Sequence, residues 1–227
     1  HWLVLRGAVG TPRHAAVAGS DRSTPSGVSE LVRSAPFLLI GVFVSLMMSV
    51  TVALPAHMVS LLREYGLAET WVIALPAAIG VIQVAGRLLM YLFEHHMDLH
   101  RVNRWVPMLI PFGLLVLLSD AGRGDASVFL AGAFVLLYGL GNGMLTIVRG
   151  TVIALYVSHA HAATLNGVLG LPQALARASA PLLLGILWSP QVGYRHGLWL
   201  MLALCLVAVA VLILAQRLSL HHLRPVD

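Results

Sequence analysis

The stretch PFLLIGVFVSLMMSVTVALPAHMVSLL, residues Pro36–Leu62, contains no Asp, Glu, Lys or Arg. A helix needs about 20 predominantly apolar residues to cross the hydrocarbon core of a bilayer. This stretch is long enough, so it predicts a membrane-spanning helix. Five further apolar stretches follow and predict an all-α multi-pass membrane protein with six transmembrane helices, the later ones being Trp71–Phe93, Trp105–Ser119, Val128–Val148, Thr164–Trp188 and Gly197–Gln216.

The composition favours the same class of protein. Of the 227 residues, 59% are hydrophobic and 10% are charged, whereas a soluble domain carries about 25% charged residues. The single cysteine, Cys205, excludes an intrachain disulfide or a cysteine-based metal site. The arginines are scattered between apolar runs rather than gathered in a basic stripe, so no nucleic-acid partner is expected, and no cofactor is implied.

The arginines predict an orientation in the membrane. Residues 1–5 are interpreted as the end of a preceding span, residues 6–35 as a polar linker, 36–216 as the six-helix bundle and 217–227 as a tail. If the linker is cytoplasmic, the positive-inside rule places both ends of the chain in the cytoplasm and the bundle in the plasma membrane, or the inner membrane of a bacterium. The cytoplasmic side then carries Arg6, Arg13, Arg22, Arg33, Arg101, Arg104, Arg217 and Arg224, against Arg63, Arg123 and Arg195 on the opposite side.

The spacing of the helices indicates an internal repeat. Predicted helices starting at residues 36, 71 and 105 are followed by helices starting at 128, 164 and 197. GVIQVAGR at 80–87 and GLPQALAR at 170–177 share the pattern G-x-x-Q-x-x-x-R. A unit of three helices enters the membrane from opposite sides in its two copies, so the pattern predicts a 3+3 inverted repeat.

Polar residues recur on one face of four helices, which predicts an aqueous cavity between them, while the third and sixth helices carry almost none. The Gly139-x-Gly141-x-Gly143 pattern predicts close helix packing rather than a nucleotide loop, and Pro55, Pro76, Pro172 and Pro181 predict bends. The polar faces are Ser45, Ser49, His57 and Ser60 in the first helix, Pro76, Gly80, Gln83, Arg87 and Tyr91 in the second, Tyr138, Asn142, Thr146 and Arg149 in the fourth, and Asn166, Gly170, Gln173, Arg177 and Pro181 in the fifth.

These features resemble the C-terminal six-helix half of the major facilitator superfamily. The resemblance is carried by GRLLMYLFEHHMDLHRVNR at 86–104, which is similar to the family's basic loop motif, and by the stretch 139–185 around the second repeat motif. The spacing of Gly80 and Arg87 is similar to that in the monocarboxylate and oxalate/formate carriers, where an arginine binds the substrate carboxylate. The resemblance implies a secondary carrier working by alternating access, with an N-terminal six-helix half as its partner.

Arginines inside the membrane are the strongest candidates for substrate binding. Arg177 lies near the middle of its helix, where a charge is unfavourable by about 2.5–3.5 kcal/mol. No Asp or Glu lies within any predicted span, so Arg177 and Arg87 either bind a small organic anion, which we expect, or pair with loop carboxylates or helix C-termini and only hold the bundle together. Arg149, at the edge of its span, is expected to anchor the helix at the interface. The remaining candidate substrate-binding residues are Gln83, Gln173, Asn142, Tyr138 and His57.

Three other functions stay open at this stage. The same fold could export drugs or other neutral solutes, or the chain could be a membrane scaffold that transports nothing. The third is a membrane di-iron oxidoreductase, because imidazole suits iron. An enzyme is not expected, since the histidines lack a second strict H-x-x-H-H box; those on the predicted cytoplasmic side are His95, His96, His100, His159, His161, His221 and His222.

Overall fold

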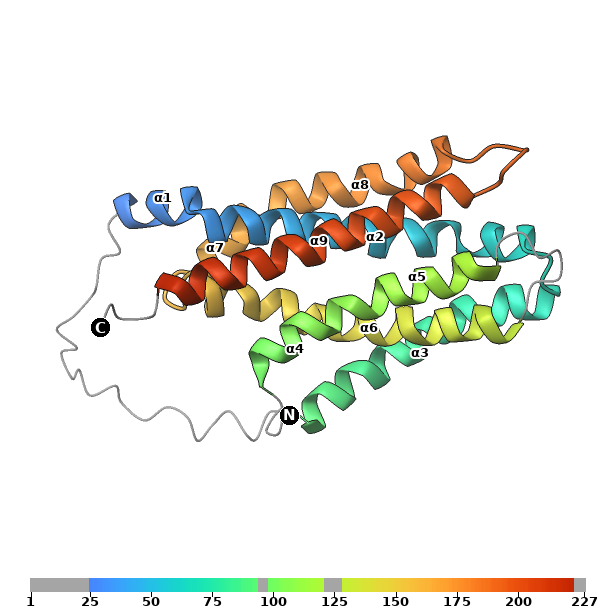
Figure 1. The fold of residues 1–227 in the computed structure, drawn as a ribbon, viewed down its shortest axis with the longest axis horizontal. Coiled ribbons are helices and arrows are strands. Elements are labelled where there is room, and N and C mark those ends of the chain that lie inside the picture. The colour runs from blue at the N-terminus through green and yellow to red at the C-terminus, as the bar shows by residue number, and fades with distance from the viewer. Residues whose placement is uncertain (1–24, 94–97, 121–127, 223–227) are drawn as a thin grey trace, which may run out of the picture.

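The computed structural model describes residues 25–93, 98–120 and 128–222. Within these ranges all the secondary-structure elements are helices. The all-α prediction is therefore confirmed. The elements are α1 (Pro25–Arg33), α2 (Ala35–Glu64), α3 (Glu69–Phe93), α4 (Leu99–Trp105), the 3-10 turn η3 (Val106–Met108), α5 (Leu109–Asp120), α6 (Val128–Tyr156), α7 (Ala162–Val168), α8 (Gly170–Ile186) and α9 (Arg195–His222) (Figure 1).

Five helices are long and apolar enough to cross a membrane, and a sixth span results if the bent pair α7 and α8 is counted as one. The bend between α7 and α8 is 40° and lies just before Pro172, whereas α2, α3 and α8 each continue as one helix through Pro55, Pro76 and Pro181. The third span, Leu99–Ser119, joins α4, η3 and α5, so it begins six residues earlier than the sequence indicated. This length accords with a multi-pass membrane protein.

The structure differs from the sequence prediction outside the apolar runs. Residues 25–33 were predicted to be part of an irregular linker, yet they form α1, whose apolar residues Val28, Leu31 and Val32 pack against the core. The local composition did not predict this helix, because Ser and Gly are frequent in the segment around it. At the other end α9 continues to His222, into the predicted tail. Residues 1–5 lie outside the described residues.

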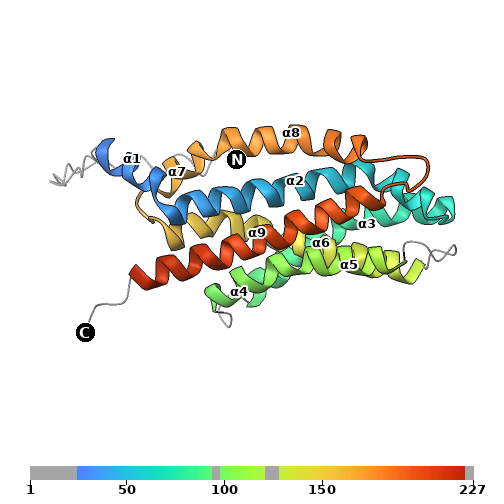
Figure 2. The ribbon, with the colours of Figure 1, turned by 45° about the horizontal axis from the view of Figure 1, so that its top comes forward.

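The helices α2 and α6 lie at the centre of the bundle. On one side α8 packs against α2, and on the other side α3 packs against α6. On a third face of this central pair α9 packs against α2, α5 packs against α6, and α5 and α9 contact each other (Figure 2). The helices α3 and α8 are therefore the outermost pair. Only 22% of the apolar window of α3 is buried, compared with 61% for α2.

Glycines bring α3 and α6 into backbone contact, which confirms the predicted close packing. A Cβ at Gly143 would lie 2.3 Å from the carbonyl oxygen of Gln83, and one at Gly139 would lie 2.7 Å from the side chain of Ile82. From the other helix, Gly86 faces the backbone of Leu140. Gly141 points elsewhere, toward α5. The spacing of four residues thus places both Gly139 and Gly143 against α3.

A hydrogen bond between α2 and α6 compensates for a proline. Pro55 lies inside α2 and has no N–H, so the carbonyl oxygen of Thr51 loses its usual helical donor. The hydroxyl of Tyr138, on α6, donates to this oxygen at 2.9 Å. Tyr138 has no exposed surface. The bond therefore satisfies a carbonyl in the centre of the bundle and allows α2 to run through Pro55 without a break.

Candidate functional site

A buried glutamine on α8 is hydrogen-bonded to two arginines. The Nη2 atom of Arg149, on α6, donates to Oε1 of Gln173 at 2.9 Å. The Nε atom of Arg177, one turn further along α8, donates to the backbone oxygen of Gln173 at 3.4 Å. Gln173 is buried, Arg149 is half-buried and Arg177 is exposed. These three residues bring α6 and α8 together at a place where the two helices otherwise make few contacts.

The charges of the two arginines are not balanced by a carboxylate in the described part of the chain. Ion pairs within that part are Arg63–Glu69 and Arg101–Asp98, both near helix ends. Arg149 and Arg177 are close enough to interact electrostatically with each other, as like charges. In addition, Nε of Arg149 is buried and has no hydrogen-bond partner among the described residues. The cluster therefore retains positive charge and free donors, which are the groups that bind an anion.

The local structure of α8 exposes backbone polarity at the same place. Gln173 comes one turn after the bend between α7 and α8. Pro181 has no N–H and cannot donate to the carbonyl of Arg177 four residues earlier. Arg177 itself lies about 13 Å along the helix from its end at Ile186. Arg177 thus lies well within α8, between the bend and Pro181.

The structure does not join the α3 candidates to this cluster. Arg87 is exposed and Gln83 is half-buried, with its backbone pressed against Gly143. Neither side chain makes a hydrogen bond to another described residue, and α3 and α8 do not pack together. Asn142, on α6, is half-buried one turn from Tyr138. These residues lie on the predicted helix faces but outside the arginine cluster.

Tyr138 and His57 already have partners within the bundle. The Tyr138 hydroxyl is bound to Thr51, as described above. In His57, Nε2 lies 2.9 Å from the carbonyl oxygen of Pro181 and Nδ1 lies 3.1 Å from the hydroxyl of Tyr194. A carbonyl can only accept, so Nε2 donates, and a neutral ring then accepts the Tyr194 proton at Nδ1. His57 thus connects α2 to α8 and to the residue just before α9.

The sequence did not predict that Arg149 belongs to the arginine cluster. Its position near the end of a span favoured an interface anchor, whereas the structure places its guanidinium on Gln173. One signal was present, because Arg149 continues the polar face of α6 that includes Asn142 and Thr146. Its partner Gln173, however, lies on a later helix, after the bend between α7 and α8, and no periodicity in the sequence predicts that pairing.

The histidines described in the structure do not form a metal site. In the ranges 25–93, 98–120 and 128–222, no three His, Cys, Asp or Glu residues lie close enough together to hold a metal ion. His100 contacts the Tyr156 hydroxyl and His161 contacts the Ser158 hydroxyl. His95 and His96 lie outside the described residues, so the oxidoreductase hypothesis stays untested.

Comparison with protein-family models and with curated proteins gives no match for this chain. The fold and the arrangement of the arginine cluster therefore carry the functional argument.

Proposed function

We propose that this chain is the C-terminal half of a major-facilitator-type secondary carrier and that it transports a small organic anion by alternating access. The observation that carries the proposal is the cluster of Arg149, Gln173 and Arg177, with two guanidinium groups, a free donor and no carboxylate partner among the described residues. Such a site binds a carboxylate by charge-assisted hydrogen bonds.

The packing of the helices supports the inverted repeat that this fold requires. Exchanging the first three spans with the last three converts the α3–α6 contact into the α8–α2 contact. The same exchange converts α5–α6 into α9–α2 and leaves the α5–α9 and α2–α6 contacts unchanged. These contacts are therefore related by the exchange, whereas the α2–α3 contact has no α6–α8 counterpart of comparable extent. This agreement favours a 3+3 arrangement.

The uncovered faces of α3 and α8 support the presence of a partner half. Large apolar residues on these two outermost helices are strongly exposed within this chain. A lipid bilayer covers part of such a surface, and in the proposed carrier an N-terminal six-helix half covers the rest. The exposed residues include Val81, Val84, Leu171, Leu175 and Leu182.

Thermal unfolding of the full-length protein in the presence of small carboxylates tests the proposal. We expect one or more anions to stabilise the wild type and to lose that effect in Arg177→Leu. Arg195→Leu is the matched control, because Arg195 is an exposed arginine at the start of α9, away from the cluster. If no anion stabilises the wild type, or if Arg177→Leu responds as the wild type does, the anion carrier is rejected and neutral or cationic solutes become the candidates.

A further inference from the structure

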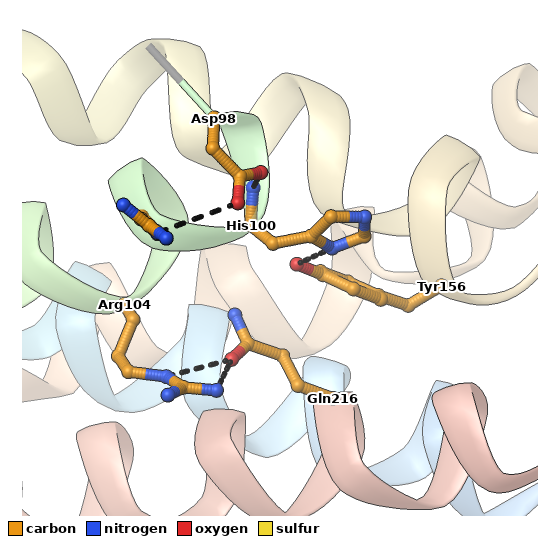
Figure 3. Close-up of polar contacts among 6 residues, drawn as sticks. Asp98, His100, Arg104, Tyr156 and Gln216 are labelled. Atoms are coloured by element: carbon orange, nitrogen blue, oxygen red, sulfur yellow. Dashed lines mark hydrogen bonds and ion pairs between the residues drawn. The ribbon is translucent and has the colours of Figure 1, made fainter.

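The short helix α4, at the start of the Leu99–Ser119 span, is fixed by its inner face. Nδ1 of His100 lies 3.1 Å from the hydroxyl of Tyr156 on α6 (Figure 3). Asn103, three residues further on, is completely buried. Because this face is held against the bundle, the orientation of the opposite face of α4 is fixed as well.

The outer face of α4 carries two arginines and a tryptophan. Arg101 and Arg104 are three residues apart, and Trp105 follows Arg101 by four, so all three share one side of the helix. The side chain of Arg101 is 83% exposed and Trp105 is 63% exposed. Arg104 is exposed too. This outer face therefore presents two guanidinium groups beside an indole ring.

Both guanidinium groups have donors to spare. Nε of Arg101 lies 3.7 Å from Oδ2 of Asp98, whose Oδ1 already accepts a hydrogen bond from the backbone of His100 at 2.9 Å. Nε and Nη2 of Arg104 reach the neutral Oε1 of Gln216, on α9, at 3.4 and 3.5 Å (Figure 3). Gln216 is buried and so fixes the direction of Arg104. Among the described contacts of this face, the carboxylate of Asp98 supplies one negative charge for the two positive charges of the arginines.

The position of the face indicates the chemistry of its partner. It lies at the end of an apolar span, with an exposed tryptophan of the kind found where lipid meets water. The anionic group present at that depth is the phosphate of a lipid headgroup, and arginine binds phosphate through two parallel hydrogen bonds. We propose that Arg101 and Arg104 bind the phosphate of an anionic glycerophospholipid, with Trp105 against its glycerol backbone.

Native mass spectrometry of the full-length protein with added phosphatidylglycerol tests this proposal. We expect the wild type to retain the lipid and the Arg101→Gln/Arg104→Gln variant to bind it at least tenfold more weakly. Arg195→Gln, at the opposite end of α9, is the matched control and should bind as the wild type does. Arg101→Gln alone should give an intermediate loss, and it keeps the Arg104–Gln216 contact in case the double variant folds poorly.

Three results would overturn the lipid site. The first is equal retention of phosphatidylglycerol by the wild type and the folded single variant. The second is an equal loss in Arg195→Gln, which would indicate attraction by net charge alone. The third is displacement of the lipid by inorganic phosphate at equal concentration, which would show that the face binds free phosphate and gains nothing from the lipid.

Discussion

The α3–α6 and α2–α8 contacts occupy equivalent places on the two sides of the bundle, but they are built differently. Between α3 and α6 the contact is backbone against backbone, with Gly143 on Gln83 and Gly86 on Leu140. Between α2 and α8 the contact is made by side chains, and Gly41 meets only the end of the Leu169 side chain. A backbone contact has no rotamers through which it can relax, whereas a side-chain contact has many.

The α2–α8 side also has free space and a polar connection. An apolar groove of about 380 Å³ follows it, and His57, on α2, is hydrogen-bonded to Pro181 in α8 and to Tyr194 just before α9. The groove is lined by Phe37, Leu38, Gly41, Val42, Ser45, Leu46, Leu169 and Pro172. We infer that α3 and α6 behave as one rigid unit, while α8 can adjust. Gln173 and Arg177 are both on the adjustable helix, which is where a binding site that changes during transport is expected.

The largest expected effect comes from filling the backbone contact. Gly143→Ala places a methyl group against the Gln83 carbonyl, so we expect a loss of about 2–3 kcal/mol in the free energy of unfolding. Gly132→Ala, on the same helix with open space around it, is the matched control and should be neutral or gain up to about 1 kcal/mol. Reversible unfolding in mixed micelles measures both. Equal stability of the two variants would refute the rigid α3–α6 unit.

A smaller effect is expected at the hydrogen bond between the two central helices. Tyr138→Phe leaves the buried Thr51 carbonyl without a donor, because Pro55 cannot supply one. The expected loss is about 1–2 kcal/mol. Tyr91→Phe, at a tyrosine that is 71% exposed, should leave the stability unchanged. If Tyr138→Phe also leaves it unchanged, the compensation for Pro55 comes from another group.

Removing the polar connection should loosen α8 without affecting α3. His57→Ala deletes the hydrogen bonds to the carbonyl of Pro181, which is half-buried, and to the hydroxyl of Tyr194, which is buried, so we expect a loss of about 1 kcal/mol. Hydrogen exchange should become faster in α8 near Pro181 and stay constant in α3. Ser60→Ala, exposed one turn further along α2, serves as the control. Faster exchange in both helices would mean that the two sides of the bundle do not move independently.

The smallest effect is expected at the glycine of the adjustable side. Gly41→Ala meets the tip of Leu169 at 3.0 Å, and that side chain can turn into the neighbouring groove. We therefore expect a change within about 0.5 kcal/mol in the same unfolding assay. A loss as large as that of Gly143→Ala would remove the distinction between the two contacts.

The positions of the spanning helices could be predicted from the sequence, because a long apolar run without charges has few other stable conformations in lipid. The glycine contact could be predicted as well, since small residues at a spacing of four bring helices together. The amphipathic helix α1 was missed because it is short and surrounded by polar residues. The role of its apolar side can be recognised only when the core against which it packs is known.

The partners of the polar side chains could not be predicted to the same extent. Pro55 implies that the Thr51 carbonyl needs a donor, but the sequence does not say that Tyr138 provides it. In the same way, Arg149 on α6 and Gln173 on α8 meet only in the folded structure, and α8 follows a 40° bend after α7. Such pairings depend on the tertiary packing of helices that are distant in sequence, and one-dimensional periodicity does not contain this information.

The most direct test of the central claim is the affinity for the stabilising carboxylate measured in a double-mutant cycle of Arg149→Gln and Arg177→Gln. A charge-assisted hydrogen bond is worth about 1.5–3 kcal/mol, so we expect each single variant to bind at least about tenfold more weakly than the wild type. Because both arginines contact Gln173, the two losses should not be additive. Wild-type affinity in both single variants, with Arg195→Gln unchanged, would contradict an anion site formed jointly by α6 and α8.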